Sequence, residues 1–376
     1  MSRGFAQAEY RARVARAQAR MQDAGLGALL LTTEPDVRYF TGFLTRFWES
    51  PSRPWFLVLP VQGDPVAVIP SIGAALMAKT WIADIRTWSA PNPADDGVSL
   101  LADTLRKVGG PVGVPSGYET HLRMPLADFE RVRTAGGLVF ADDGGIVAGL
   151  RAIKSEAEIS KIADTCTIAG RAFARMAEIA GEGVPLSQVF RDFQRLLLEE
   201  GADWVPYIAG GAGPDGYGDV ISPASDAPLR AGDVMMLDTG AVRDGYFCDY
   251  DRNFAIGRAS ASAQDGYARL IEATQAAFEM ARPGVLACDL WRVMADIVGA
   301  GEEAGRLGHA LGMQLTEGLS LTPHDKTELR AGMVLTLEPG VEIRPGTIMV
   351  HEENIAITEG VARRLSPFAG PGLPVI

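Results

Sequence analysis

The amino-acid sequence predicts an α/β protein built from two domains, residues 1–150 and 151–376. Three observations predict this architecture. The chain has 376 residues, of which 47% are hydrophobic and 22% charged, a composition typical of a globular protein large enough for two cores. Strand-like apolar runs alternate with helix-like periodic segments up to Leu150. A helix-capping motif at Ser155 then opens a region with a different pattern.

The elements of the first domain are predicted from apolar periodicity and turn residues. Gly63-Asp64 separates two short apolar runs and predicts a hairpin between them. The segment around Tyr39 is predicted to be a strand that leads into an exposed loop. The predicted helices span 14–24, 100–107 and 124–132, and the predicted strands span 28–32, 56–59, 65–69, 112–114 and 138–140.

The second domain begins with a long amphipathic helix. Ser155 and Glu158 form an S-x-x-E capping box at its start. Further on, the segment that begins at Gly183 resembles the segment that begins at Gly284, and each follows a helix that carries Ala-Phe. The similarity indicates either two related halves with a central site between them or a chance likeness of two amphipathic helices.

Charge and cysteine content exclude several classes of partner. The chain has 35 Lys and Arg against 47 Asp and Glu, so its net charge of −12 disfavours nucleic acid and anionic membranes. No apolar run reaches the roughly 18 residues of a membrane span, and the start of the chain lacks the apolar core of a signal peptide. Three isolated cysteines form no disulfide framework. A cytoplasmic protein is predicted.

Two acidic residues of the second domain are predicted to lie side by side. An apolar run, Val234-Met-Met-Leu, leads directly into Asp238, so this carboxylate is expected at the end of a buried strand. Glycines at 240 and 245 favour a hairpin that returns Asp249 to the same place. Adjacent carboxylates repel each other unless a cation or a shared proton lies between them. Taken alone, an Asp before Thr-Gly is more often a simple turn residue.

Similar chemistry recurs later in the chain. Apolar strand-like runs lead into Glu338 and into the pair Glu352 and Glu353, and spacing alone does not decide which member of the pair points inward. His309 adds an imidazole in a glycine-rich stretch. Four carboxylates and one imidazole suit a pair of divalent ions such as Mn, Co, Fe or Zn, a type of centre that commonly activates water for hydrolysis.

These residues resemble those of the pita-bread metallohydrolase family, which includes methionine aminopeptidase, Xaa-Pro aminopeptidase and dipeptidase, and creatinase. The segments 39–43 and 150–159 extend the resemblance over nearly the whole chain, to the creatinase and prolidase branch. The resemblance implies a creatinase-like N-terminal domain with a mixed sheet, followed by a pita-bread catalytic domain with two divalent metal ions. It also implies a homodimer.

By position, the resemblance implies five metal ligands. Asp238 matches a bidentate aspartate, Asp249 a bridging aspartate, and His309 the imidazole ligand. Glu338 matches the glutamate that binds metal and serves as general base. Glu353 matches the final bridging glutamate.

Two histidines that are usual in the family's peptidases are absent. The stretch 219–226 has none, and Thr316 stands at the second position. Tyr207, Thr316 or His324 is expected to replace them in holding the substrate carbonyl. We therefore expect a hydrolase that resembles Xaa-Pro aminopeptidase or dipeptidase and cleaves a C–N bond in a small substrate. The alternatives are a non-peptidase enzyme, like the family's dimethylsulfoniopropionate lyase or ectoine hydrolase, and a binding module without catalysis.

The loop 45–55 is a further candidate for substrate binding. It concentrates tryptophan and arginine, which are enriched where partners bind. In the implied dimer, Trp48 and either Arg46 or Arg53 are expected to reach a carboxylate or zwitterion at the neighbour's metal site. The alternative is a loop that packs on its own domain.

Overall fold

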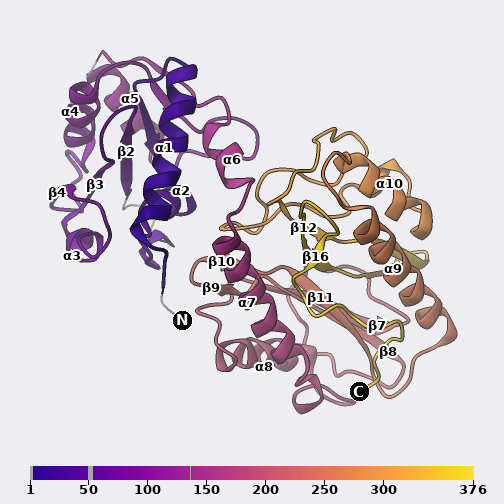
Figure 1. The fold of residues 1–376 in the computed structure, drawn as a ribbon. Coiled ribbons are helices and arrows are strands. Elements are labelled where there is room, and N and C mark those ends of the chain that lie inside the picture. Colours follow the sequence, from indigo (N-terminus) through magenta and orange to yellow (C-terminus); the bar gives the residue numbers. More distant parts are fainter. Residues whose placement is uncertain (1–2, 50–53, 136) are drawn as a thin grey trace. The chain divides into compact units, whose positions relative to one another are not determined.

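The computed structural model describes residues 3–49, 54–135 and 137–376, and the chain divides into two compact units, Met1–Arg151 and Ala152–Ile376 (Figure 1). Each unit combines helices and strands around a buried hydrophobic core of its own, so the predicted α/β class is confirmed. Within the described ranges, no helix is long and apolar enough to cross a membrane.

The first unit is a six-stranded mixed sheet with the order β4-β3-β2-β1-β5-β6. The hairpin predicted at Gly63-Asp64 joins β2 to β3, and these strands pair antiparallel. Strand β6 begins two residues later than predicted. The elements are α1 (Gln7–Asp23), β1 (Ala28–Leu31), α2 (Glu34–Thr41), β2 (Phe56–Pro60), β3 (Val66–Pro70), α3 (Ala74–Met77), β4 (Asp84–Trp88), α4 (Val98–Val108), β5 (Val112–Val114), α5 (Leu126–Ala135), β6 (Phe140–Asp142) and α6 (Ile146–Arg151).

Tyr39 lies on helix α2, so the predicted strand at this position is wrong. The Thr33 side chain caps the helix by accepting a hydrogen bond from the Asp36 backbone N–H. Gly42 ends the helix in the left-handed conformation, at φ 77°. The apolar residues of the segment taken alone favour a strand, but the capping residues at both ends favour the helix.

The loop after α2 does not present its tryptophans to solvent. Trp48 and Trp55 are buried, at 5% and 2% relative exposure, and their ring centroids are 5.9 Å apart. Trp48 therefore belongs to the core of the first unit, as in the alternative of a loop that packs on its own domain. Arg46 is exposed, and Arg53 lies outside the described residues.

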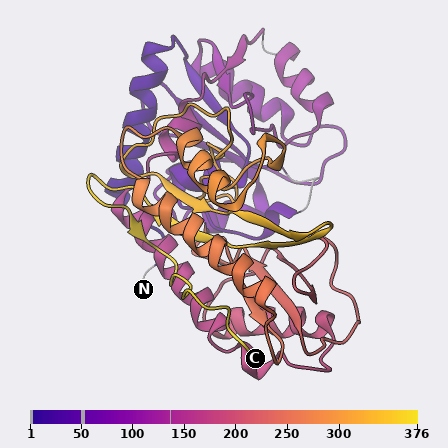
Figure 2. The same cartoon turned by 90° about the vertical axis from the view of Figure 1, so that its right-hand side faces the viewer.

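The second unit repeats one pattern twice, a pair of helices followed by antiparallel strands. Helices α7 and α8 precede the sheet β11-β8-β7, and helices α9 and α10 precede the sheet β12-β15-β16 and the hairpin β13-β14. Helix α9 runs along the strands of its half (Figure 2). The elements are α7 (Glu156–Phe173), α8 (Leu186–Glu199), β7 (Ile208–Pro214), β8 (Asp233–Thr239), β9 (Val242–Arg243), β10 (Tyr246–Phe247), β11 (Tyr250–Ala255), α9 (Ala261–Met280), α10 (Ala287–Val298), β12 (Val334–Leu337), β13 (Gly340–Arg344), β14 (Thr347–Val350), β15 (Glu353–Ala356) and β16 (Arg363–Arg364).

The predicted capping box opens α7. The Ser155 hydroxyl accepts a hydrogen bond from the Glu158 backbone N–H at 3.4 Å, and the Ser155 N–H donates to the Glu158 carboxylate at 3.0 Å. The buried Glu158 carboxylate also accepts from the Tyr246 hydroxyl at 2.9 Å. The capping residue thus fixes the helix start and ties it to the strands of the first half.

Candidate metal centre

The predicted hairpin brings Asp238 and Asp249 together. Strands β8 and β11 pair antiparallel, with Thr239 opposite Tyr250, so Asp249 lies just beyond the last pair and beside Asp238. Tyr207 precedes β7 on the other side of β8. Its hydroxyl donates a hydrogen bond to Asp249 and lies 3.1 Å from Oδ2 of Asp238. Two of the predicted ligands and one predicted substrate residue therefore share one end of this sheet.

His309 approaches this pair from the second half. Gly308 has a φ of 136°, and a Cβ atom there would lie 2.4 Å from the Thr336 carbonyl oxygen, so only glycine fits. The Thr336 hydroxyl accepts from the His309 backbone N–H at 3.1 Å. Ring atom Nδ1 lies 3.1 Å from the Ala310 carbonyl oxygen. A proton on Nδ1 leaves the lone pair of Nε2 toward Oδ2 of Asp249, 3.1 Å away.

Glu352 completes a set of three potential ligands. Single side-chain atoms of Asp249, His309 and Glu352 all lie within 4.8 Å of one another, and all three residues are buried. Glu338 directly follows β12. Because Gly340 pairs with Val350 in the hairpin, strand alternation places Glu338 and Glu352 on one face of the sheet.

Glu353 points away from this group. Its carboxylate pairs with Arg252 at 3.0 Å and accepts hydrogen bonds from the Ser366 hydroxyl and from the Ala369 N–H. The structure therefore brings Glu352 to the ligand group in place of Glu353. Alternation is the sequence signal that separates the two, because Met349 is a core residue and Glu353 lies on its side of the strand.

The group carries more negative charge than its neighbours neutralise. Atoms Oδ1 of Asp238 and Oε1 of Glu352 are buried and have no hydrogen-bond partner among the described residues. Burial, with repulsion from Asp249, raises the pKa of Asp238 and of Glu352 well above the ordinary values. Burial also raises the pKa of Glu338 to about 7. Oxygen donors with one imidazole, unpaired and repelling one another, fit divalent transition-metal ions.

The pKa of Glu338 predicts how pH affects the protein without metal. Its value is about 7 in the fold and 4.5 ordinarily, so between these values the folded state retains a proton that the unfolded chain has lost. Its stabilising contribution is therefore complete below 4.5 and is lost as pH rises to about 7. We expect the melting temperature of chelator-treated protein to fall from about pH 5 to about pH 7, less steeply in Glu338→Gln. An equally steep fall in that variant would contradict this assignment.

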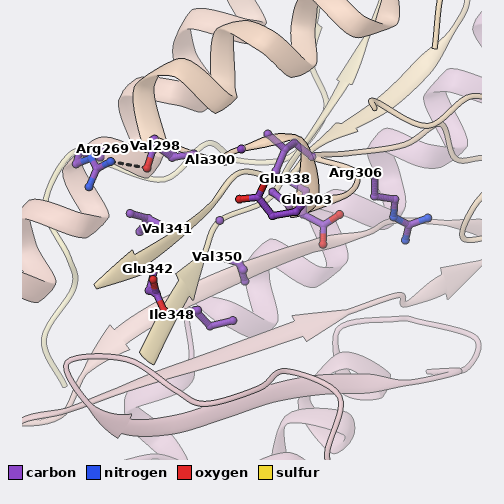
Figure 3. Close-up of a pocket in the computed structure, with 15 residues that line it drawn as sticks. Arg269, Val298, Ala300, Glu303, Arg306, Glu338, Val341, Glu342, Ile348 and Val350 are labelled. Carbon is purple, nitrogen blue, oxygen red and sulfur yellow. Dashed lines mark hydrogen bonds between the residues drawn. The ribbon is translucent and has the colours of Figure 1, made fainter. Parts of the chain in front are cut away.

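A pocket of about 590 Å³ adjoins Glu338, a size typical of sites for small molecules (Figure 3). One wall is the hairpin face that carries Gly340, Glu342, Ile348 and Val350. Figure 3 shows Glu338 between Arg269 on one side and Arg306 on the other. The face that bears the candidate ligands thus continues into a cavity with both apolar and charged walls.

The remaining predicted residues lie in different surroundings. Thr316 is partly buried, and its hydroxyl accepts a hydrogen bond from Arg306 at 3.2 Å, which places it near the pocket. His324 is exposed in a turn, and no contact that the structure describes joins it to the carboxylate group. Arg306 also lines the pocket, and no sequence motif predicts it as a site residue.

Comparison with known proteins identifies both units. Residues 13–153 match the creatinase/prolidase N-terminal domain, and residues 160–359 match metallopeptidase family M24. A probable dipeptidase, PepE of Mycobacterium tuberculosis, is 30% identical over 328 residues, which are 84% of this chain and 83% of that protein. An Xaa-Pro dipeptidase of Pyrococcus horikoshii is 30% identical over 238 residues, which are 60% of this chain and 63% of that protein.

Solved structures share the whole fold. The dipeptidase PepE of Mycobacterium ulcerans superimposes with a TM-score of 0.84 at 27% identity, and the match covers 99% of each chain. A prolidase from Thermococcus sibiricus has a TM-score of 0.87 at 23% identity, covering 99% of this chain and 100% of that one. The predicted fold, a creatinase-like domain followed by a pita-bread domain, is confirmed. The chain belongs to metallopeptidase family M24.

Proposed function

We propose that this protein uses divalent metal ions to hydrolyse the amide bond of a dipeptide or a similarly small substrate. The observation that carries the proposal is the buried group of carboxylates, in which one oxygen of Asp238 and one of Glu352 have no hydrogen-bond partner within the described part of the chain. Such an arrangement is costly unless cations bind there. The dipeptidase names of the relatives and the size of the adjoining pocket support the choice of substrate.

We propose two metal ions, of Mn, Co, Fe or Zn, as the cofactors. The ligands in this proposal are Asp238, Asp249, His309, Glu338 and Glu352, with Glu352 in the place that the family resemblance gives to Glu353. When bound, the ions would supply electrophilic activation of water and of the substrate carbonyl.

Glu338 is the general base of this proposal. It lines the pocket and lies on the face of the hairpin that carries Glu352, and a positioned carboxylate can serve as a general base. Its carboxylate would accept a proton from the attacking water and return it to the leaving nitrogen.

Tyr207 is the best-placed substitute for the missing histidines. Its hydroxyl lies between the carboxylates of Asp238 and Asp249, so a small rotation would direct it toward a substrate oxygen bound there. Thr316, beside Arg306, is a second candidate for substrate contact. We assign no such role to His324.

The substrate class is tested with purified protein that has been treated with chelator and reloaded with Mn²⁺ or Co²⁺. We expect hydrolysis of Xaa-Pro or other dipeptides only in the reloaded protein, at rates of about 1–10³ per second. N-acyl amino acids and dimethylsulfoniopropionate serve as alternative substrates in the same assay. Cleavage of dimethylsulfoniopropionate alone would replace the peptidase by a lyase, and metal binding without turnover of any substrate would contradict the proposed activity.

We also propose a homodimer in the cytoplasm. Three free buried cysteines are compatible with a reducing compartment. Sedimentation of the purified protein tests the oligomeric state, and a monomer at micromolar concentration would contradict it.

A further inference from the structure

A second cluster of buried ionisable side chains lies next to the candidate ligands, with Asp251 opposite Asp238 in the pairing of β11 with β8. It consists of Asp251, Arg252, His351 and Glu353. Ring atom Nδ1 of His351 lies 3.4 Å from Oδ1 of Asp251, and Nε2 lies 3.3 Å from Oε1 of Glu353. Arg252 forms an ion pair with the other oxygen of Glu353 at 3.0 Å. The cluster therefore forms a continuous row of alternating acidic and basic groups.

This cluster differs from the candidate metal centre in its contacts. It contains two carboxylates, one guanidinium and one imidazole, and each carboxylate lies beside a basic side chain. The carboxylates of the candidate metal centre instead lie beside one another.

Two side chains of the cluster form hydrogen bonds with the backbone of Glu352. The carboxylate of Asp251 accepts a hydrogen bond from the Glu352 N–H at 3.1 Å. The Arg252 guanidinium donates to the Glu352 carbonyl oxygen at 3.3 Å. Both polar groups of one peptide residue are thus held by side chains of adjacent residues on β11. Glu352 lies just before β15, which belongs to a different sheet.

At two other points between the two halves, side chains likewise form hydrogen bonds with both backbone polar groups of one residue. The Asn354 amide accepts from the Asp249 N–H at 3.0 Å and donates to the Asp249 carbonyl oxygen. At Val350, the N–H donates to the Tyr217 hydroxyl and the carbonyl accepts from the Asn253 amide, each at 2.7 Å. Side chains therefore join the halves at Asp249 and Glu352, the residues whose carboxylates must converge.

We propose that Asp251, Arg252, His351 and Glu353 act as a positioning layer, which holds the backbone of Glu352 and so directs its carboxylate into the metal centre. The inference rests on the proposed function, because it takes Glu352 to be a metal ligand. Asp251 and Arg252 hold the peptide directly, and His351 fixes Asp251 by linking it to Glu353. All four act through Glu352 and are positioning residues.

The experiment compares Asp251→Ala with Asp251→Asn. Alanine removes the acceptor for the Glu352 N–H, whereas asparagine keeps an oxygen in that position. Mn²⁺ affinity is measured by calorimetry on chelator-treated, folded protein, and the visible spectrum is recorded after loading with Co²⁺. We expect Asp251→Ala to weaken Mn²⁺ binding about tenfold to a hundredfold and to alter the Co²⁺ bands. Asp251→Asn should bind Mn²⁺ more tightly than the alanine variant and keep a spectrum close to the original.

Two further variants separate positioning from general loss of stability. His351→Gln cannot contact both carboxylates as an imidazolium does, and we expect it to weaken Mn²⁺ binding about tenfold. If Asp251→Ala does not fold, the Mn²⁺ affinity of His351→Gln tests the proposal in its place. Leu290→Ala, a buried change in α10, is the matched control that destabilises the fold without touching the layer, and its Mn²⁺ affinity should match the original protein.

The outcomes distinguish a failure of the positioning layer from a failure of the proposed function. If the original protein binds Mn²⁺ and Glu352→Gln does not, the ligand assignment stands. Original affinity and an unchanged Co²⁺ spectrum in Asp251→Ala and His351→Gln would then overturn the positioning layer alone. Equal weakening in the alanine and asparagine variants would also overturn it. If the original protein binds no Mn²⁺, the proposed function itself fails.

Discussion

Glu352→Gln is expected to weaken Mn²⁺ binding by at least about a hundredfold, because loss of a direct ligand should cost no less than loss of a supporting one. The same change should raise the melting temperature of the metal-free protein. It removes a buried carboxylate that repels Asp249 and Glu338 and whose Oε1 accepts no hydrogen bond from any described residue. Calorimetric titration and thermal unfolding of chelator-treated protein measure both effects.

The adjacent residue provides the matched control. Glu353→Gln removes the charge that pairs with Arg252 and His351 inside the protein. Removing one member of a buried ion pair costs roughly 3–5 kcal/mol, so the melting temperature should fall. The two neighbouring variants are therefore expected to change stability in opposite directions. A rise in Glu353→Gln together with a fall in Glu352→Gln would reverse the assignment of the two glutamates.

Glu338→Gln is expected to reduce kcat by about 10²–10⁴-fold, the range that a general base contributes. Its removal from the ligand set should add a loss of Mn²⁺ affinity, so kcat is measured at saturating metal. Glu342→Gln is the control, because Glu342 lines the same pocket from the same face of the hairpin, four residues after Glu338. It should leave kcat close to the original value. A loss of kcat in the control as large as that in Glu338→Gln would contradict the role of Glu338 as general base.

Local signals predict that Asp238 and Asp249 lie close together. The convergence of Asp238 and Asp249 follows from an apolar run, two glycines and a hairpin, all within a short stretch of chain. The capping box at Ser155 is local in the same way. Such features depend on neighbouring residues and are therefore accessible from sequence.

The features that the sequence does not predict depend on contacts between distant segments. Trp48 resembles an exposed loop residue until Trp55 is seen to pack against it. Glu352 and Glu353 are separated only when the face of Met349 is known to be the core. The contact between Asp251 and His351 joins β11 to the segment between β14 and β15, and nothing in the local sequence of either segment indicates the partner.

We propose above that the converging carboxylates bind divalent ions. Elemental analysis of purified protein, after dialysis against Mn²⁺ and removal of free metal, tests it most directly. We expect two ions per chain in the original protein and their loss in the double variant Asp238→Ala, Glu338→Ala, with the fold retained by circular dichroism. Metal content that is the same in the double variant and the original protein, or no bound metal in either, would contradict it.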